Sequence, residues 1–103
     1  IERAQQIGAI LVDRLEKMRA ADPRIGDIRG RGAMVAAEFV VPATGDPDGT
    51  LTSTIAKACI AEGVIVLTCG TYGNVIRFLP PLSISDELLH EALDVVAAAL
   101  SAA

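Results

Sequence analysis

The chain has 103 residues, of which 51% are hydrophobic, 21% charged and 3% aromatic, and its formal net charge is −4. This length is enough for one domain with a core of small aliphatic side chains. The acidic balance, the lack of a Lys/Arg cluster and the scarcity of aromatic rings argue against nucleic acid as a partner. The apolar runs are far shorter than the roughly 20 residues of a membrane-spanning helix, so no membrane partner is expected.

A helix is predicted at the beginning of the chain. Apolar residues recur there at helical spacing, at Ile7, Ile10, Leu11, Leu15 and Met18. The helix is expected to stop near Asp22-Pro23, because the residue before a proline is pushed out of the α region. No capping side chain precedes the helix, and we therefore expect residues 1–103 to be a piece of a longer chain.

Two extended stretches, 24–29 and 33–41, are predicted next. The segment Gly30-Arg31-Gly32 between them is expected to form a tight turn and not a phosphate loop, because it does not open a helix. With a period of two, one face of the second stretch carries Val35, Ala37, Phe39 and Val41. The other face is also mostly apolar, with Met34, Ala36, Glu38 and Val40. We therefore expect this strand to be covered on both sides.

A short helix and a second hairpin are predicted in the second half of the chain. A loop rich in Gly, Pro and Asp, 42–50, leads to Thr52 and Ser53, which are candidate N-caps for the helix. Gly63 is placed to end it. Strands are expected at 64–69 and 75–79, joined by a turn whose glycines can adopt positive φ.

The last helix has the clearest start signal. Ser85 is a good N-cap, and Asp86 and Glu87 complement the positive end of the helix dipole. The complete order is α-β-β-α-β-β-α. Strands in hairpin pairs predict an α+β fold, a small antiparallel sheet with helices packed on it.

Most residues capable of chemistry have ordinary structural explanations. His90, the single histidine, is expected on the solvated side of the last helix, so no Ser/His/Asp triad can be assembled. Cys59 is expected in the core, and Cys69 is interpreted as a more exposed, inert thiol. The two cysteines have neither metal-site nor CxxC spacing, which is typical of reduced thiols in a cytoplasmic protein.

Arg77 is the exception, because it interrupts an otherwise apolar strand, Val-Ile-Arg-Phe-Leu. A guanidinium cannot give up its proton in proteins, so in a buried place it needs a carboxylate or phosphate partner. One interpretation pairs it internally with Glu38 on the neighbouring strand. The other assigns it a ligand carboxylate, held by two parallel hydrogen bonds. The residues alone leave both open.

Two longer stretches carry a resemblance to a known family. The sequence LTCGTYGNVIRFLPPLSISDELLHEAL, residues 67–93, resembles the C-terminal segment of class III aminotransferases, which use pyridoxal 5′-phosphate. The sequence IGDIRGRGAMVAAEFV, residues 25–40, is similar to a hairpin in the small domain of the same family. The turn Cys-Gly-Thr-Tyr-Gly-Asn and the strand after it look most like the subgroup that acts on 4-aminobutyrate.

The resemblance implies that the cofactor and the substrate carboxylate are bound by different domains. Family members are fold-type-I enzymes with a large cofactor-binding domain and a small C-terminal α+β domain, to which residues 1–103 would correspond. Arg77 matches the arginine that binds the substrate carboxylate, and Gly70 would let its turn lie near the mouth of the active site. Lys17 and Lys57 lack the sequence context of the Schiff-base lysine. No catalytic, cofactor-binding or metal-binding residue is therefore expected here, and the chain alone should be inactive.

For the whole enzyme, the resemblance implies transfer of the amino group of 4-aminobutyrate to 2-oxoglutarate, giving succinate semialdehyde and glutamate. Its partners would be an amino donor, a 2-oxo acid and a second copy, in a homodimer or a dimer of dimers. Another class III enzyme, of the ornithine or acetylornithine type, is an alternative. A free-standing α+β binding module is a further alternative, from a different class of protein.

Overall fold

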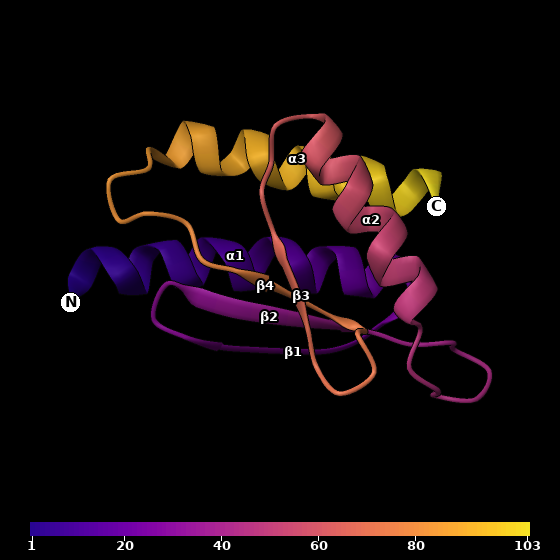
Figure 1. The fold of residues 1–103 in the computed structure, drawn as a ribbon. Coiled ribbons are helices and arrows are strands. Elements are labelled where there is room, and N and C mark those ends of the chain that lie inside the picture. Colours follow the sequence, from indigo (N-terminus) through magenta and orange to yellow (C-terminus); the bar gives the residue numbers. More distant parts are fainter.

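The computed structural model describes residues 1–103 and confirms the predicted order of elements. The helices are α1 (Glu2–Ala21), α2 (Gly49–Ala61) and α3 (Asp86–Ala102), and the strands are β1 (Ile25–Arg31), β2 (Met34–Phe39), β3 (Leu67–Cys69) and β4 (Val75–Phe78) (Figure 1). The strands form one sheet in the order β1-β2-β4-β3, and all neighbours are antiparallel. The predicted α+β class is confirmed. None of the helices combines the length and apolarity that crossing a membrane requires.

Helices α1 and α2 pack on one face of the sheet, and α3 packs on these two helices on the same side (Figure 1). That face carries Val35, Ala37 and Phe39 of β2 and Ile76 and Phe78 of β4, all of them buried. The helices contribute most of the rest of the same core, with Ile7, Leu11, Leu15, Leu51, Ile55, Cys59, Leu89, Leu93, Val96 and Leu100 among their residues. The predicted apolar stripe of α1 is therefore confirmed.

The opposite face of the sheet is open within residues 1–103, so the expectation that β2 is covered on both sides is met on one side only by this chain. Met34 on this face is 38% exposed, and no helix of the chain lies over it. A helix buries one apolar stripe. The stripes of the three helices face one another and the same side of the sheet, so no helix of the chain is left to cover the other side. The open face is where the charged side chains of the sheet lie.

Helix α1 lies unusually close to the turn between β1 and β2. Gly8 is buried in the helix, and a Cβ built on it would be 3.0 Å from the carbonyl carbon of Gly32 and closer still to its oxygen. Gly32 has a φ of +57°, as expected for a tight turn. A side chain at residue 8 would therefore push the helix away from the hairpin.

Three local predictions were wrong. The turn expected at Gly30-Arg31-Gly32 begins only at Gly32, because Gly30 and Arg31 belong to β1, where they pair with Val35 and Met34. The N-cap of α2 is Asp48, whose Oδ1 accepts a hydrogen bond from the backbone N–H of Leu51 at 3.0 Å, and not Thr52 or Ser53. Thr52 is inside the first turn, where its hydroxyl donates to the backbone oxygen of Asp48 at 2.8 Å. The strand predicted at 64–69 begins only at Leu67, because the N–H of residue 64 donates to the end of α2. The predicted N-cap Ser85 is confirmed, since its Oγ accepts from the N–H of residue 88.

Candidate functional site

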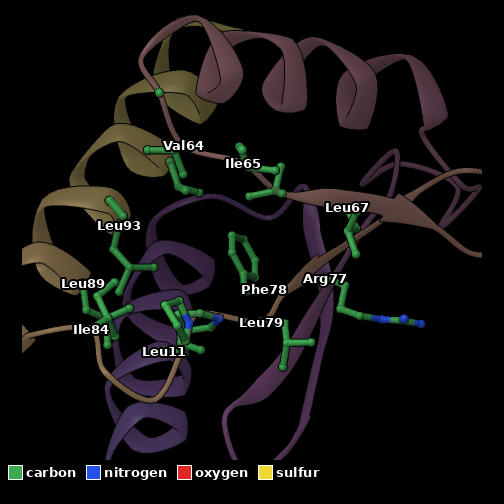
Figure 2. A pocket seen from close by; sticks show the side chains of 16 residues that line it. Leu11, Val64, Ile65, Leu67, Arg77, Phe78, Leu79, Ile84, Leu89 and Leu93 are labelled. Atoms are coloured by element: carbon green, nitrogen blue, oxygen red, sulfur yellow. The ribbon is translucent and has the colours of Figure 1, made fainter.

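Arg77 lies on the open face of the sheet. Its neighbours Ile76 and Phe78 are buried toward the helices, whereas Arg77 is exposed, because successive side chains of a strand point to opposite faces. The register places Arg77 between Ala36 of β2 and Leu67 of β3. The small side chain of Ala36 leaves space beside the guanidinium, which Figure 2 shows pointing away from the apolar side chains around it.

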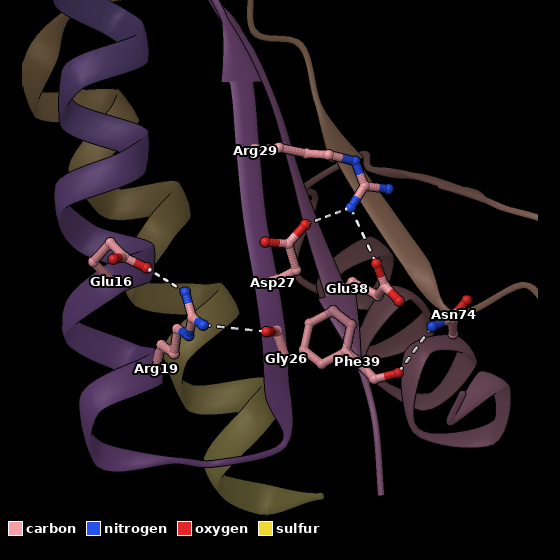
Figure 3. Close-up of polar contacts among 8 residues, drawn as sticks. All are labelled: Glu16, Arg19, Gly26, Asp27, Arg29, Glu38, Phe39 and Asn74. Atoms are coloured by element: carbon pink, nitrogen blue, oxygen red, sulfur yellow. Dashed lines mark hydrogen bonds and ion pairs between the residues drawn. The ribbon is translucent and has the colours of Figure 1, made fainter. Parts of the chain in front are cut away.

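The interpretation that paired Arg77 with Glu38 is wrong. Glu38 Oε2 instead accepts a hydrogen bond from Arg29 Nη1 at 3.1 Å, and the same nitrogen donates to Asp27 Oδ2 at 2.9 Å (Figure 3). The hydrogen bond to Asp27, followed by the one to Glu38, raises the pKa of Arg29 above its ordinary value. The side chain of Arg77 has no hydrogen bond or ion pair within residues 1–103, so its fork of donors is open to a ligand.

A groove of about 290 Å³ crosses this open face. It is lined by Arg29, Gly30, Arg31, Met34, Ala36, Cys69, Val75 and Arg77. Arg29 is neutralised by its two carboxylates, but Arg31, like Arg77, has no acidic partner in the chain. The groove therefore has an excess of positive charge, which favours a small anionic ligand.

The second predicted site residue, Gly70, lies in the turn between β3 and β4. Gly70 and Gly73 have φ of +90° and +64°, and the N–H of Gly73 donates to the oxygen of Gly70 at 3.1 Å. The conformation of this turn explains both glycines. Gly70 does not line the groove, although its neighbour Cys69 does. A substrate contact by Gly70 stays a prediction.

A larger, apolar groove of about 520 Å³ runs between α3, the segment before β3 and the segment after β4. Its lining includes Leu67, Leu79, Ile84, Leu89 and Leu93, and Arg77 lies on its border. Ile65 and Leu79 are 85% and 62% exposed, respectively. The apolar groove and the positively charged groove thus meet at Arg77.

The remaining residues with possible chemistry are not brought together. Lys17 forms an ion pair with Asp13 at 3.1 Å on the outside of α1, and Lys57 is exposed on α2. His90 is exposed on α3, where its Nδ1 lies 2.9 Å from Arg14 Nη1. Burial raises the pKa of the Cys59 thiol, which keeps it protonated and unreactive. No lysine lines either groove, so the residues present do not fit pyridoxal phosphate, which needs a lysine for its Schiff base.

Sequence reasoning missed Arg29 and Arg31 as residues of the groove. A signal for them existed, because Asp27, Arg29 and Arg31 alternate with a period of two and must share one face of a strand. A one-residue irregularity between Ile25 and Asp27 puts Ile25 in the core and these three charged residues on the open face. Gly26 lies at that irregularity, but a glycine alone does not fix which face the residues after it take.

The sequence and the fold match one known family. The model of the family described as aminotransferase class-III matches residues 1–100, and the chain therefore belongs to the class III aminotransferases. It is 57% identical over 101 residues to a 4-aminobutyrate aminotransferase of Mycobacterium bovis, an alignment that covers 98% of this chain and 22% of that relative. It is 43% identical over 98 residues to a 5-aminovalerate aminotransferase of Pseudomonas aeruginosa, covering 94% of this chain and 23% of that relative.

A solved structure gives the same result. A Bacillus anthracis aminotransferase matches 99% of this chain and 24% of its own, with a TM-score of 0.87 and 30% sequence identity. The resemblance carried by residues 25–40 and 67–93 is confirmed at the level of the family. The chain spans less than a quarter of the length of these relatives.

Proposed function

We propose that residues 1–103 are the C-terminal small domain of a longer class III aminotransferase, in which Arg77 binds the carboxylate of the 2-oxo acid and of the amino acid formed from it. The observation that carries this proposal is an unpaired guanidinium on the open face of the sheet, in a groove with excess positive charge. The short span of the chain relative to its family members supports the presence of a large domain elsewhere in the polypeptide.

Arginine suits this role for a physical reason. Its planar fork can hold both oxygens of a carboxylate, and hydrogen bonds to charged groups contribute about 1.5–3 kcal/mol each. Two such bonds also fix the orientation of the carbon next to the carboxylate, where the amino group is exchanged. A domain closing over the open face would exclude water and strengthen both bonds.

The cofactor is assigned to the part of the enzyme outside this chain. Pyridoxal 5′-phosphate supplies the amino-transfer chemistry when it is bound, and Lys17 and Lys57 are both exposed and do not line the groove. The chain's own contribution is to bind and orient a carboxylate. The 103 residues alone are therefore expected to be inactive.

For the whole enzyme we propose transfer from 4-aminobutyrate to 2-oxoglutarate, giving succinate semialdehyde and glutamate. Its support is the 57% identity to a relative named for 4-aminobutyrate. The 43% identity to a relative named for 5-aminovalerate makes that longer amine the second candidate donor, beside ornithine or acetylornithine. A cytoplasmic location and a homodimer or dimer of dimers complete the proposal. Membership of the family disfavours a free-standing binding module.

The test uses the full-length enzyme that contains this chain and its Arg77→Gln variant. We expect kcat/KM for 2-oxoglutarate to fall about 10- to 150-fold, the equivalent of one lost charged hydrogen bond, while the absorbance of the bound cofactor persists. Comparing 4-aminobutyrate, 5-aminovalerate and ornithine as donors identifies the amine. A variant with unchanged kinetics for 2-oxoglutarate would show that Arg77 does not bind the substrate.

A further inference from the structure

The charged side chains on the open face are arranged so that one arginine is neutralised and another is not. Arg29 of β1 donates to Asp27 on its own strand and to Glu38 on β2 (Figure 3). Arg77 of β4, on the other side of β2, has no acidic partner within residues 1–103. The row across the sheet is Arg29, Ala36, Arg77, because Ala36 is the register partner of both arginines. Glu38, two residues further along β2, lies on the same face of the sheet, with Asp27 and Val75 as its register partners.

Glu38 is within reach of Arg77. Its register partner on β4 is Val75, and Arg77 is two residues further along that strand, on the same face. Such diagonal neighbours are about 7–8 Å apart at the backbone, a distance that long side chains bridge readily. Arg31, the other arginine without an acidic partner, is the register partner of Met34. Met34 is four residues from Glu38 along β2, whereas Ala36, the register partner of Arg77, is two residues from it. If Glu38 lost its present partner, Arg77 would be the nearest cation.

We propose that Arg29 is a positioning residue that holds Glu38 away from Arg77 and so keeps Arg77 free for the substrate carboxylate. Glu38 and a substrate carboxylate would compete for the same fork of donors, since both are carboxylates. The hydrogen bond from Arg29 Nη1 to Glu38 Oε2, at 3.1 Å, holds Glu38 on the β1 side, and the bond from the same nitrogen to Asp27 Oδ2, at 2.9 Å, ties the guanidinium to β1. The inference rests on the proposed function of Arg77 and names the residue that keeps it available.

The experiment compares three variants of the full-length enzyme with the wild type: Arg29→Gln, the double variant Arg29→Gln with Glu38→Gln, and Arg77→Gln. Arg19→Gln is the matched control, because Arg19 is also an exposed arginine bonded to a glutamate and to β1, but on the helix side of the sheet. The measurements are KM and kcat for 2-oxoglutarate and the dissociation constant of glutarate, an unreactive dicarboxylate. Melting temperatures report any loss of folding.

We expect Arg29→Gln to raise KM for 2-oxoglutarate and the dissociation constant of glutarate about three- to fivefold, the range of a partly exposed ion pair, with little change in kcat. Removing the charge of residue 38 in the same enzyme should restore both constants to within about twofold of wild type. Arg19→Gln should change neither. If Arg29 had a purely structural role, removing the charge of residue 38 as well would not restore KM and the dissociation constant.

Two results overturn the inference. The first is Arg29→Gln kinetics equal to wild type, and the second is a double variant as impaired as Arg29→Gln. Either result, combined with a strongly impaired Arg77→Gln, leaves the proposed function intact. Wild-type behaviour of Arg77→Gln refutes the proposed function itself, and the inference with it.

Discussion

Substituting Gly8 by alanine should destabilise the fold, although the same change on a solvent-exposed helix is stabilising. Gly8 is buried where α1 crosses the turn between β1 and β2. A Cβ at this position would lie 3.0 Å from the carbonyl carbon of Gly32 and closer to its oxygen. The obstacle is backbone, which cannot rotate away as a side chain can. The helix, the turn or both must therefore shift.

Two opposing contributions set the magnitude. Alanine is better than glycine in the middle of a helix by about 1 kcal/mol. Inserting a methyl group into a filled space costs about 1–3 kcal/mol, and contact with fixed backbone justifies the upper value. The net loss in free energy of unfolding for Gly8→Ala is therefore about 2 kcal/mol. The neighbouring Ala9 is exposed, so Ala9→Gly should cost about 1 kcal/mol from helix propensity alone.

Urea unfolding of the wild-type chain and the two variants, followed by far-ultraviolet circular dichroism, measures these differences. Both variants should lower the midpoint without changing the slope, and Gly8→Ala should lower it more. A midpoint for Gly8→Ala at or above that of the wild type would refute the reasoning. It would mean that helix propensity outweighs the contact and that α1 does not lie so close to the hairpin.

Three further predictions concern other parts of the fold. Asn74→Ala should lower the free energy of unfolding by about 1–2 kcal/mol in urea, because its buried Nδ2 donates to the Phe39 carbonyl at 3.1 Å; a neutral result would contradict this role. Asp48→Ala should cost about 1 kcal/mol in the same assay through the lost N-cap, and an effect below a few tenths would argue against the cap. A hydrogen bond from Arg24 lowers the pKa of Asp22, so its contribution to stability is complete above the ordinary carboxyl pKa of about 4 and is lost as the pH falls further. Unfolding measured from pH 7 to pH 3 should show a shallower acid decline for Arg24→Gln, and an unchanged decline would exclude this contribution.

Local patterns were sufficient to predict most of the elements. The stripe of α1, the N-cap Ser85 and the glycines of the second hairpin each depend on residues a few positions apart, and the structure has all three as predicted. The N-cap of α2 was misplaced because Asp48, Thr52 and Ser53 all carry a suitable side-chain oxygen. Only the path of the incoming loop selects Asp48.

The candidate site was predicted in part. Arg77 was recognised because one charged residue in a strand of apolar residues is conspicuous in any sequence. Its freedom from Glu38 was not predictable, since it depends on β1 lying on the other side of β2 and on the register that brings Arg29 to Glu38. Both are contacts between strands, and the amino acids within one strand do not encode them.

The sequence by itself determined the order of helices and strands, the antiparallel α+β class and membership of the class III aminotransferases, and it singled out Arg77 as the candidate site residue. Periodicity, caps and turns act over a few residues, and a family resemblance is carried by the residues themselves. Only the tertiary structure decided which face of the sheet the helices cover and which arginine takes Glu38. Those outcomes depend on packing and strand register, which join residues distant in the chain and are decided only when the core is complete.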